Sequence, residues 1–209
     1  KERHVEMSEK ITSPKARLAF ANTLFEARSA KGSSTKKFGC SLIFEEDARK
    51  SPEYAKLRAA ITEAGRAERK HWDGTKFDEL VKAKKIRIPL LNGNDSVSAK
   101  TGEVYDGFAG NTFIRPTSKL QPGIVDGRLQ PILEPKDLYS GCYVRATLGI
   151  FTYETEGNRG VSFGLRNVQK LADGPALAGG ASRAEDDFTP VDSVAGTDTG
   201  FEGADDLPY

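Results

Sequence analysis

Two long segments in the C-terminal half of the chain alternate apolar and polar residues, and this pattern constrains the fold most strongly. Residues 141–153 form the longest alternating run in the chain, and residues 161–171 resume the pattern after the turn residues Glu156, Gly157 and Asn158. A period of two is typical of half-buried β-strands, and a turn of this composition joins antiparallel strands. The two segments therefore predict a long β-hairpin.

The two faces of this predicted hairpin differ in chemistry. Apolar side chains share one face, which we expect to be buried: Cys142, Val144, Ala146, Leu148, Ile150, Val161, Phe163, Leu165 and Leu171. Aromatic, cationic and small polar side chains share the other: Tyr143, Arg145, Thr147, Phe151, Tyr153, Ser162, Arg166 and Lys170. Unpaired bases stack on aromatic rings while cations follow the phosphates, so the second face predicts a surface that binds single-stranded nucleic acid. The alternative is that another element covers this face and its aromatic side chains belong to the core.

The rest of the chain supplies further strands and one helix. Period-two patterns predict strands within residues 15–25, 37–44, 86–90 and 108–115. In the first of them, Leu18, Phe20 and Leu24 are predicted to share one face. Ser51 and Pro52 are typical of a helix start, and the apolar residues that follow them predict an amphipathic helix to about residue 71.

This inventory predicts a mainly β fold, an OB-fold-like antiparallel Greek-key barrel of five or six strands with one inserted α-helix. We expect the barrel to span residues 14–175 and to follow a flexible N-terminus of residues 1–13. Residues 176–209 are rich in Gly and Ala and then acidic. They cannot bury enough apolar area to fold, so we expect a disordered linker and tail there.

Charge is divided sharply along the chain. Residues 184–209 contain eight acidic residues and no Lys or Arg, which leaves 31 basic and 22 acidic residues in 1–183. The body therefore carries a net charge of +9 and the tail −8. A basic body suits a polyanion, and an acidic tail can imitate one, although acidic tails also serve as solubility aids. Further residues predicted to extend the binding surface are Lys37 and Arg115, with Phe25, Lys36, Lys119 and Arg128 as weaker candidates.

The sequence offers little to an enzyme. Its two histidines are His4 and His71, and no Gly-rich phosphate loop joins a strand to a helix. The carboxylates of the body that could serve a two-metal nuclease lack the spacing for it: Asp95, Glu103, Asp106 and Asp126. We therefore expect no catalytic residue, no metal and no cofactor.

Cysteine usage and hydropathy indicate the compartment. Cys40 and Cys142 are sparse and the chain shows no export signal, so we predict two buried thiols in preference to a disulfide. No apolar run approaches the roughly 18 residues that a membrane-spanning helix needs, so no membrane partner is expected. The predicted location is the cytoplasm.

Several motifs resemble a known family. They are residues 140–146 (SGCYVRA), 160–170 (GVSFGLRNVQK), 173–174 (DG) and 14–22 (PKARLAFAN). They are similar to a family of tailed-phage proteins, formerly of unknown function, that is placed among the OB-fold single-stranded-DNA-binding proteins. The resemblance implies sequence-independent binding of single-stranded DNA in phage DNA replication, recombination and repair, in the cytoplasm of the host cell.

The last five residues form a candidate docking peptide: Asp205, Asp206, Leu207, Pro208 and Tyr209. A disordered acidic segment with a hydrophobic end suits a pocket rimmed by Lys and Arg. It also resembles the acidic tips of bacterial single-stranded-DNA-binding proteins, which normally end in Phe where this chain has Tyr209. We expect the tail to compete for the DNA groove and to recruit replication or recombination proteins.

Two other function classes stay open on the sequence alone. The barrel could be a protein-interaction adaptor whose acidic tail only solubilises it, or a metal-dependent nuclease. Failure to shift oligo-dT at modest salt would favour the adaptor, and release of nucleotides with Mg²⁺ would favour the nuclease. The oligomeric state is not predicted.

Overall fold

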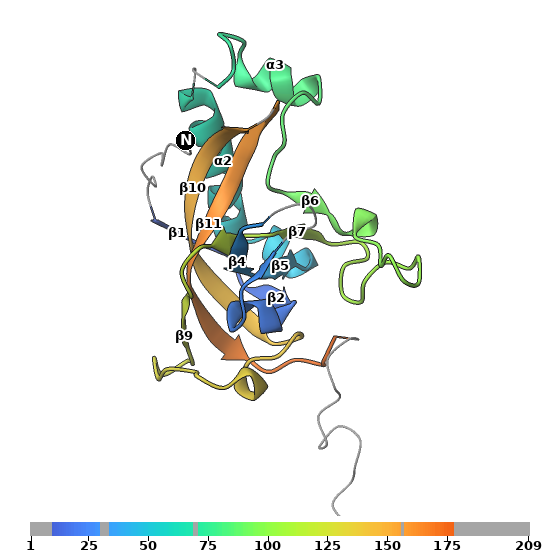
Figure 1. Cartoon of the computed structure of the whole chain (residues 1–209), viewed down its shortest axis with the longest axis vertical. Helices are drawn as coiled ribbons and strands as arrows, with labels where there is room; N and C mark the ends of the chain where they lie inside the picture. Colours follow the sequence, from blue (N-terminus) through green and yellow to red (C-terminus); the bar gives the residue numbers. More distant parts are fainter. Residues whose placement is uncertain (1–9, 30–33, 69–70, 156, 178–209) are drawn as a thin grey trace, which may run out of the picture.

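The computed structural model describes residues 10–29, 34–68, 71–155 and 157–177 (Figure 1). Its helices are α1 (Glu46–Arg49), α2 (Pro52–Ala67) and α3 (Phe77–Lys82), with 3-10 turns η1 (Ala21–Leu24), η2 (Gly93–Asp95) and η3 (Pro135–Asp137). Its strands are β1 (Lys10–Thr12), β2 (Ala16–Ala19), β3 (Arg28–Ser29), β4 (Lys36–Gly39), β5 (Ser41–Phe44), β6 (Leu91–Asn92), β7 (Thr112–Ile114), β8 (Thr117–Ser118), β9 (Gly123–Val125), β10 (Tyr143–Thr155) and β11 (Asn158–Ala172). The prediction of a mainly β fold is confirmed.

The strands pair in a closed circuit. β4 and β5 follow one another with a bend at Cys40, and β7 and β8 follow one another across Arg115 and Pro116. The two joined segments pair antiparallel, β4 with β8 and β5 with β7. β8 then pairs with β11 in parallel at Gly164, β11 pairs with β10, β10 pairs with β2, and β2 returns to β5. The circuit has five members, which are the joined segments β4–β5 and β7–β8 and the strands β11, β10 and β2, and it curls the sheet as the predicted OB-like fold requires.

The hairpin predicted for residues 141–171 is the longest element of the structure. β10 and β11 pair antiparallel over nearly their whole length, and their upper half extends beyond the barrel in Figure 1. α2 packs against this half of the hairpin. Ser51 caps α2 as predicted, because its hydroxyl accepts the backbone N–H of Tyr54 at 3.2 Å.

A β-bulge in β11 changes which of its side chains face the core. Arg166 is an extra residue in β11 where the pairing with β10 shifts register. Since side chains alternate along a strand, the residues from Asn167 to Lys170 face the opposite way from an uninterrupted pattern, and a second register shift leaves Leu171 between the paired residues Lys170 and Ala172. Val168 is therefore 1% exposed, whereas Leu171 is 40% exposed. The prediction that Leu171 belongs to the buried face is wrong for this reason.

The main core fills the barrel and continues beneath α2. It joins the inward residues of β2, β5, β7, β10 and β11 to Leu57 and Ile61 of α2. Trp72 closes the far end, where it is 1% exposed and its indole N–H donates to the carbonyl of Gly65 at 2.7 Å. Cys40 and Cys142 are buried free thiols, as predicted.

A second, smaller apolar cluster lies on the outer side of β2, β5 and β7. Ala19, Ile43 and Phe113 project there from the three strands, and Phe108 and Leu177 cover them. Leu177 is 3% exposed and its backbone N–H donates to the carbonyl of Ser140 at 2.9 Å. The chain therefore stays attached to the body at 176–177, where we expected the disordered linker to begin.

Other segments also differ from the sequence-based expectation. Residues 10–12, expected to belong to a flexible terminus, form β1 and pair with β10. Residues 86–90 form no regular strand and touch the sheet through one bridge, between Arg87 and Gly160. Phe20 does not continue β2 with Leu18 but begins the turn η1 with its side chain 41% exposed. Among the described helices, none has the length and apolar character needed to span a bilayer.

Candidate nucleic-acid interface

A hollow of about 170 Å³ lies where residues 87–91 cross the hairpin. It is lined by Arg87, Ile88, Pro89, Leu91, Arg115, Tyr153, Val161, Ser162 and Phe163. Two backbone hydrogen bonds hold the crossing segment on β11: Arg87 N–H donates to the Arg159 carbonyl, and Val161 N–H donates to the Arg87 carbonyl, each at 2.9 Å. Gly160 permits this approach, because a Cβ there would lie 2.2 Å from the Arg87 carbonyl oxygen.

The walls of this hollow combine an aromatic ring, apolar side chains and two guanidinium groups. Tyr153 is half-buried, whereas Ile88 and Leu91 are 38% and 36% exposed. Arg115 lies over the ring of Phe113 at 4.9 Å from its centroid and donates to the hydroxyl of Ser96 at 3.1 Å. Burial lowers the pKa of Arg115, but a guanidinium still remains protonated at neutral pH. A base and its phosphates would find a stacking surface and cations within one small site.

Four of the predicted surface residues either line the hollow or lie on the outward-facing positions of β10. Tyr153 and Arg115 line the hollow together. Phe151 is half-buried and lies across the strand pair from Ser162, which also lines it. Arg145 is exposed further along β10, where its Nε donates to the side-chain oxygen of Gln169 at 2.8 Å. The outer face of β10 is thus open at least in part.

Tyr143 occupies a different setting, at the end of β10 that pairs with β2. The ammonium group of Lys15 lies 4.6 Å from the centroid of its ring, and Gly174 packs so close that a Cβ there would lie 2.9 Å from the ring. Burial and a hydrogen bond to the carboxylate of Glu45 raise the pKa of the Tyr143 hydroxyl. The ring already has partners, and it does not join the hollow.

Lys170 faces the interior side of the sheet, because the bulge at Arg166 precedes it in β11 and reverses the alternation. Its ammonium group donates to the Asp137 carbonyl at 2.8 Å and pairs with Asp173 at 2.8 Å, and its side chain is 18% exposed. The prediction that Lys170 lies on the open face is therefore wrong. Arg166, the bulged residue, is half-buried, and its Nε is buried without a hydrogen-bond partner among the described residues.

Lys37 lies apart from the hollow, on the hairpin of β3 and β4. It is exposed there beside Lys36, and its backbone pairs with Arg28. The docking peptide Asp205 to Tyr209 lies outside the described residues, as does the whole acidic tail of residues 184–209. Among the described residues, no group of His, Cys, Asp and Glu is arranged to hold a metal ion.

The residues of the hollow that the sequence did not point to come mainly from the crossing segment. Arg87 and Ile88 belong to the strand predicted within residues 86–90, since apolar residues alternate there, and Leu91 follows it. Their place over the hairpin depends on the close approach at Gly160, and a glycine beside a predicted strand is a sequence signal for such an approach.

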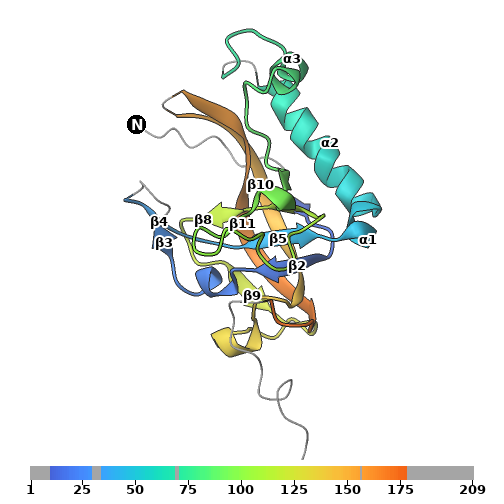
Figure 2. The same ribbon diagram turned by 90° about the vertical axis from the view of Figure 1, so that its right-hand side faces the viewer.

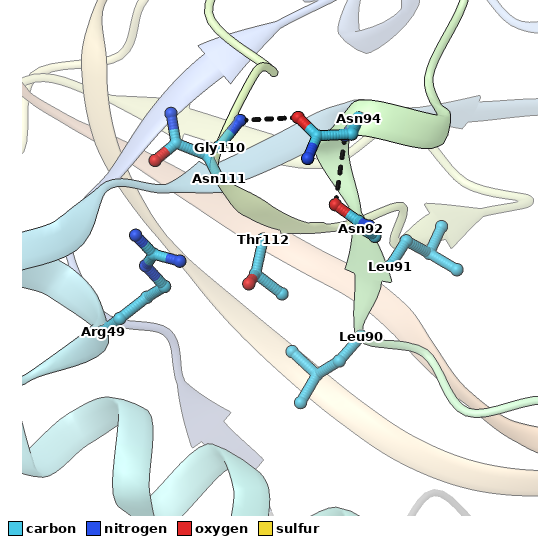
Figure 3. Close-up of a pocket in the computed structure, with 8 residues that line it drawn as sticks. All are labelled: Arg49, Leu90, Leu91, Asn92, Asn94, Gly110, Asn111 and Thr112. Atoms are coloured by element: carbon cyan, nitrogen blue, oxygen red, sulfur yellow. Dashed lines mark hydrogen bonds between the residues drawn. The ribbon is translucent and has the colours of Figure 1, made fainter.

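A larger hollow of about 290 Å³ lies at the β6–β7 edge (Figure 3). It is lined by Arg49, Leu90, Leu91, Asn92, Asn94, Gly110, Asn111 and Thr112. The side-chain oxygens of Asn92 and Asn94 accept backbone N–H groups of Asn94 and Gly110, at 3.1 and 2.8 Å, so these amides also build the loop. No aromatic ring lines this hollow, and it therefore offers no surface for base stacking.

Comparison with known proteins places the chain among phage proteins. The sequence model described as "Enterobacter phage Enc34, ssDNA-binding protein" matches residues 9–199. Protein p50 of Acyrthosiphon pisum secondary endosymbiont phage 1 is 31% identical over 182 residues, which make up 86% of this chain and 92% of p50.

Solved structures share the fold. The single-stranded DNA-binding protein of bacteriophage Enc34 in complex with ssDNA superposes with a TM-score of 0.61 at 15% identity, over 84% of this chain and 96% of that one. The bacteriophage T7 single-stranded DNA-binding protein gp2.5 superposes with a TM-score of 0.51 at 12% identity, over 84% and 98%. The family match over residues 9–199 and the close relative p50 confirm the resemblance seen in the sequence motifs, and the chain belongs to the family of the Enterobacter phage Enc34 single-stranded-DNA-binding protein.

Proposed function

We propose that the chain binds single-stranded DNA, without sequence preference and without cleaving it, on the outer face of the barrel around the Tyr153 hollow. One observation carries this proposal: Tyr153, the apolar side chains of Ile88 and Leu91, and the guanidinium groups of Arg87 and Arg115 converge on one hollow. Every base has a π-face, so stacking on Tyr153 would not select among bases, and the two arginines would contact phosphates.

Family membership and charge support the same ligand. The Enc34 protein, whose family this chain shares, has been solved in complex with single-stranded DNA. Residues 1–183 carry a net charge of +9, which favours a polyanion over a neutral protein partner.

A titration of fluorescent oligo-dT against duplex DNA of the same length tests the proposal. We expect tighter binding to oligo-dT, and a logarithmic affinity that falls with log salt at a slope of about −0.7 per phosphate neutralised. Oligo-dT should stay intact when Mg²⁺ is added. Equal affinity for both DNAs, a flat salt dependence or release of nucleotides would each contradict the proposal.

We further propose that the acidic tail competes with DNA and recruits other proteins of phage DNA replication, recombination and repair. The tail follows Leu177, which packs on the outer cluster with Phe108 and Phe113, so this polyanion of charge −8 is tethered to the folded body that carries the binding face. Tethering gives a high effective concentration, and attraction of this kind weakens as the Debye length falls to about 8 Å near physiological salt.

Deletion of residues 184–209 tests the tail. The truncated protein should bind oligo-dT more tightly than the full chain at low salt, and the difference should shrink as salt rises. Removing only residues 207–209 should leave DNA affinity unchanged, since their side chains carry no charge, but should abolish capture of replication proteins. Equal affinity of full-length and truncated protein at low salt would show that the tail does not compete.

A further inference from the structure

Phe20 is an exposed aromatic residue in an unusual backbone conformation. Its φ and ψ are 58° and 42°, in the left-handed region, and its side chain is 41% exposed. A left-handed conformation is unfavourable for a residue with a Cβ, and Gly or Asn is the ordinary choice for it. A phenylalanine here directs a large, partly exposed ring to the surface at the end of β2.

The ring of Phe20 belongs to a continuous series of aromatic rings. It meets Tyr105 edge to face with centroids 5.4 Å apart, and Phe108 at 6.1 Å. Phe108 in turn contacts Phe113 at 4.8 Å, and the guanidinium of Arg115 lies over Phe113 at 4.9 Å. The series therefore leads from Phe20, across the outer side of β2, β5 and β7, to the wall of the Tyr153 hollow.

Cationic side chains are found on β4, next to the Phe20 turn, in addition to Arg115. The Thr23 hydroxyl is within hydrogen-bond distance of both the Phe20 carbonyl, at 2.7 Å, and the Gly39 carbonyl, at 2.5 Å, so the turn is tied to the end of β4. β4 carries Lys36 and Lys37, both exposed. A chain of phosphates that leaves Arg115 and passes Phe20 would thus meet a second cationic group.

We infer that Phe20, supported by Tyr105, is a second base-stacking site for the same DNA strand, separated from the Tyr153 hollow by Arg115. This inference rests on the proposed function and extends it, since it assigns the path of the DNA strand from the β10–β11 hairpin toward the β3–β4 hairpin. The ligand is an unpaired base, which can cover an exposed ring edge and face while its phosphates lie between Arg115 and Lys37. The rigid support of Tyr105 and Phe108 fixes the ring before the base arrives.

Phe20→Ala tests this site, with Leu129→Ala as the matched control. Leu129 is also apolar, 68% exposed and at positive φ, 65°, but it lies in the turn after β9. Loss of one stacked base should weaken binding of a long oligo-dT about 5- to 150-fold, which corresponds to roughly 1–3 kcal/mol. Leu129→Ala should bind as the wild type does. Phe20→Trp should retain affinity, because it restores a ring.

A further variant and a modified oligonucleotide test the same site. Phe20→Leu preserves apolar packing on Tyr105 without a π-face. Its Tm should be near that of the wild type, while its affinity for oligo-dT should be reduced as in Phe20→Ala. A set of oligo-dT molecules, each with a single abasic position at a different place, scans the bound DNA. At one place the missing base should weaken binding to the wild type but not to Phe20→Ala. Unchanged affinity of both Phe20→Ala and Phe20→Leu would overturn the inference.

The controls separate this inference from the proposed function. If wild-type protein does not bind oligo-dT, the proposed function itself fails. If Tyr153→Ala loses affinity and Phe20→Ala does not, only the second stacking site fails. A change in self-association by sedimentation, with DNA affinity unchanged, would identify Phe20 as a contact between protein copies and would also overturn the inference.

Discussion

Replacing Gly160 with alanine tests whether residues 87–91 form a wall of the binding hollow. The new Cβ would lie 2.2 Å from the Arg87 carbonyl oxygen and 3.0 Å from the Arg87 carbonyl carbon. Since these are backbone atoms, the crossing segment must move off β11. The two hydrogen bonds that join Arg87 to β11 should then be lost.

The magnitude follows from these two bonds. Each contributes about 0.5–1.5 kcal/mol net, so Gly160→Ala should lower the free energy of unfolding by about 1–3 kcal/mol. For a chain of this size each 1 kcal/mol lowers Tm by about 2–4 °C, which gives a fall of roughly 2–12 °C. At a temperature where the variant is still folded, its affinity for oligo-dT should also fall, because Arg87 and Ile88 leave the hollow.

Gly127→Ala is the matched control, because a Cβ at Gly127 would meet no atom within 4 Å and its φ is not in the left-handed region. It should change Tm and affinity little. Thermal melts and anisotropy titrations of both variants decide the outcome. If Gly160→Ala melts like Gly127→Ala, the crossing segment is not seated as described. If it melts early but binds DNA normally, the hollow is not part of the binding site.

Three further predictions follow from single side chains. Tyr153→Ala should weaken oligo-dT binding by about 1–3 kcal/mol while Tyr153→Phe should not, as anisotropy titrations will show. Arg145→Ala should weaken binding without lowering Tm, whereas Lys170→Ala should lower stability by about 1–3 kcal/mol through its lost interior contacts; the reverse pattern would refute the assigned orientations. Burial raises the pKa of Cys40 from 9.0 to about 12, so the thiol ionises at lower pH in the unfolded chain than in the folded one. The free energy of unfolding should therefore fall as pH rises from 9.0 toward 12. Urea unfolding at several pH values, compared with Cys40→Ala, isolates this contribution.

The sequence predicted the barrel because period two is a direct consequence of half-buried strands. Residues 141–153 and 161–165 alternate as the structure has them, and Ser51 begins α2 where its capping chemistry indicated. The alternation failed beyond Arg166, because one extra residue reverses the phase of a strand and no residue type marks that insertion reliably. Lys170 was assigned to the wrong face for this reason, and so was Leu171, which also lies at a second register shift.

The binding site was less predictable than the barrel, since it depends on contacts between distant segments. Tyr153 and Arg115 were identified from residue chemistry, but the partners that complete the hollow come from residues 87–91, which approach the hairpin only at Gly160. Phe20 was assigned to the face of Leu18 because the alternation continues through it. Its left-handed backbone ends β2 at Ala19 and turns the ring outward.

The closure of the barrel between β2 and β10 also constrains how the chain is made. β2 emerges from the ribosome early, but the strand that completes its pairing begins at Tyr143, so synthesis of the whole middle of the chain separates the two partners. During that interval β2 and β5 can pair while β2 still presents an open edge, and unpaired edges favour aggregation. A nascent chain stalled before β10 should therefore be a substrate for chaperones, whereas one released after β11 should not.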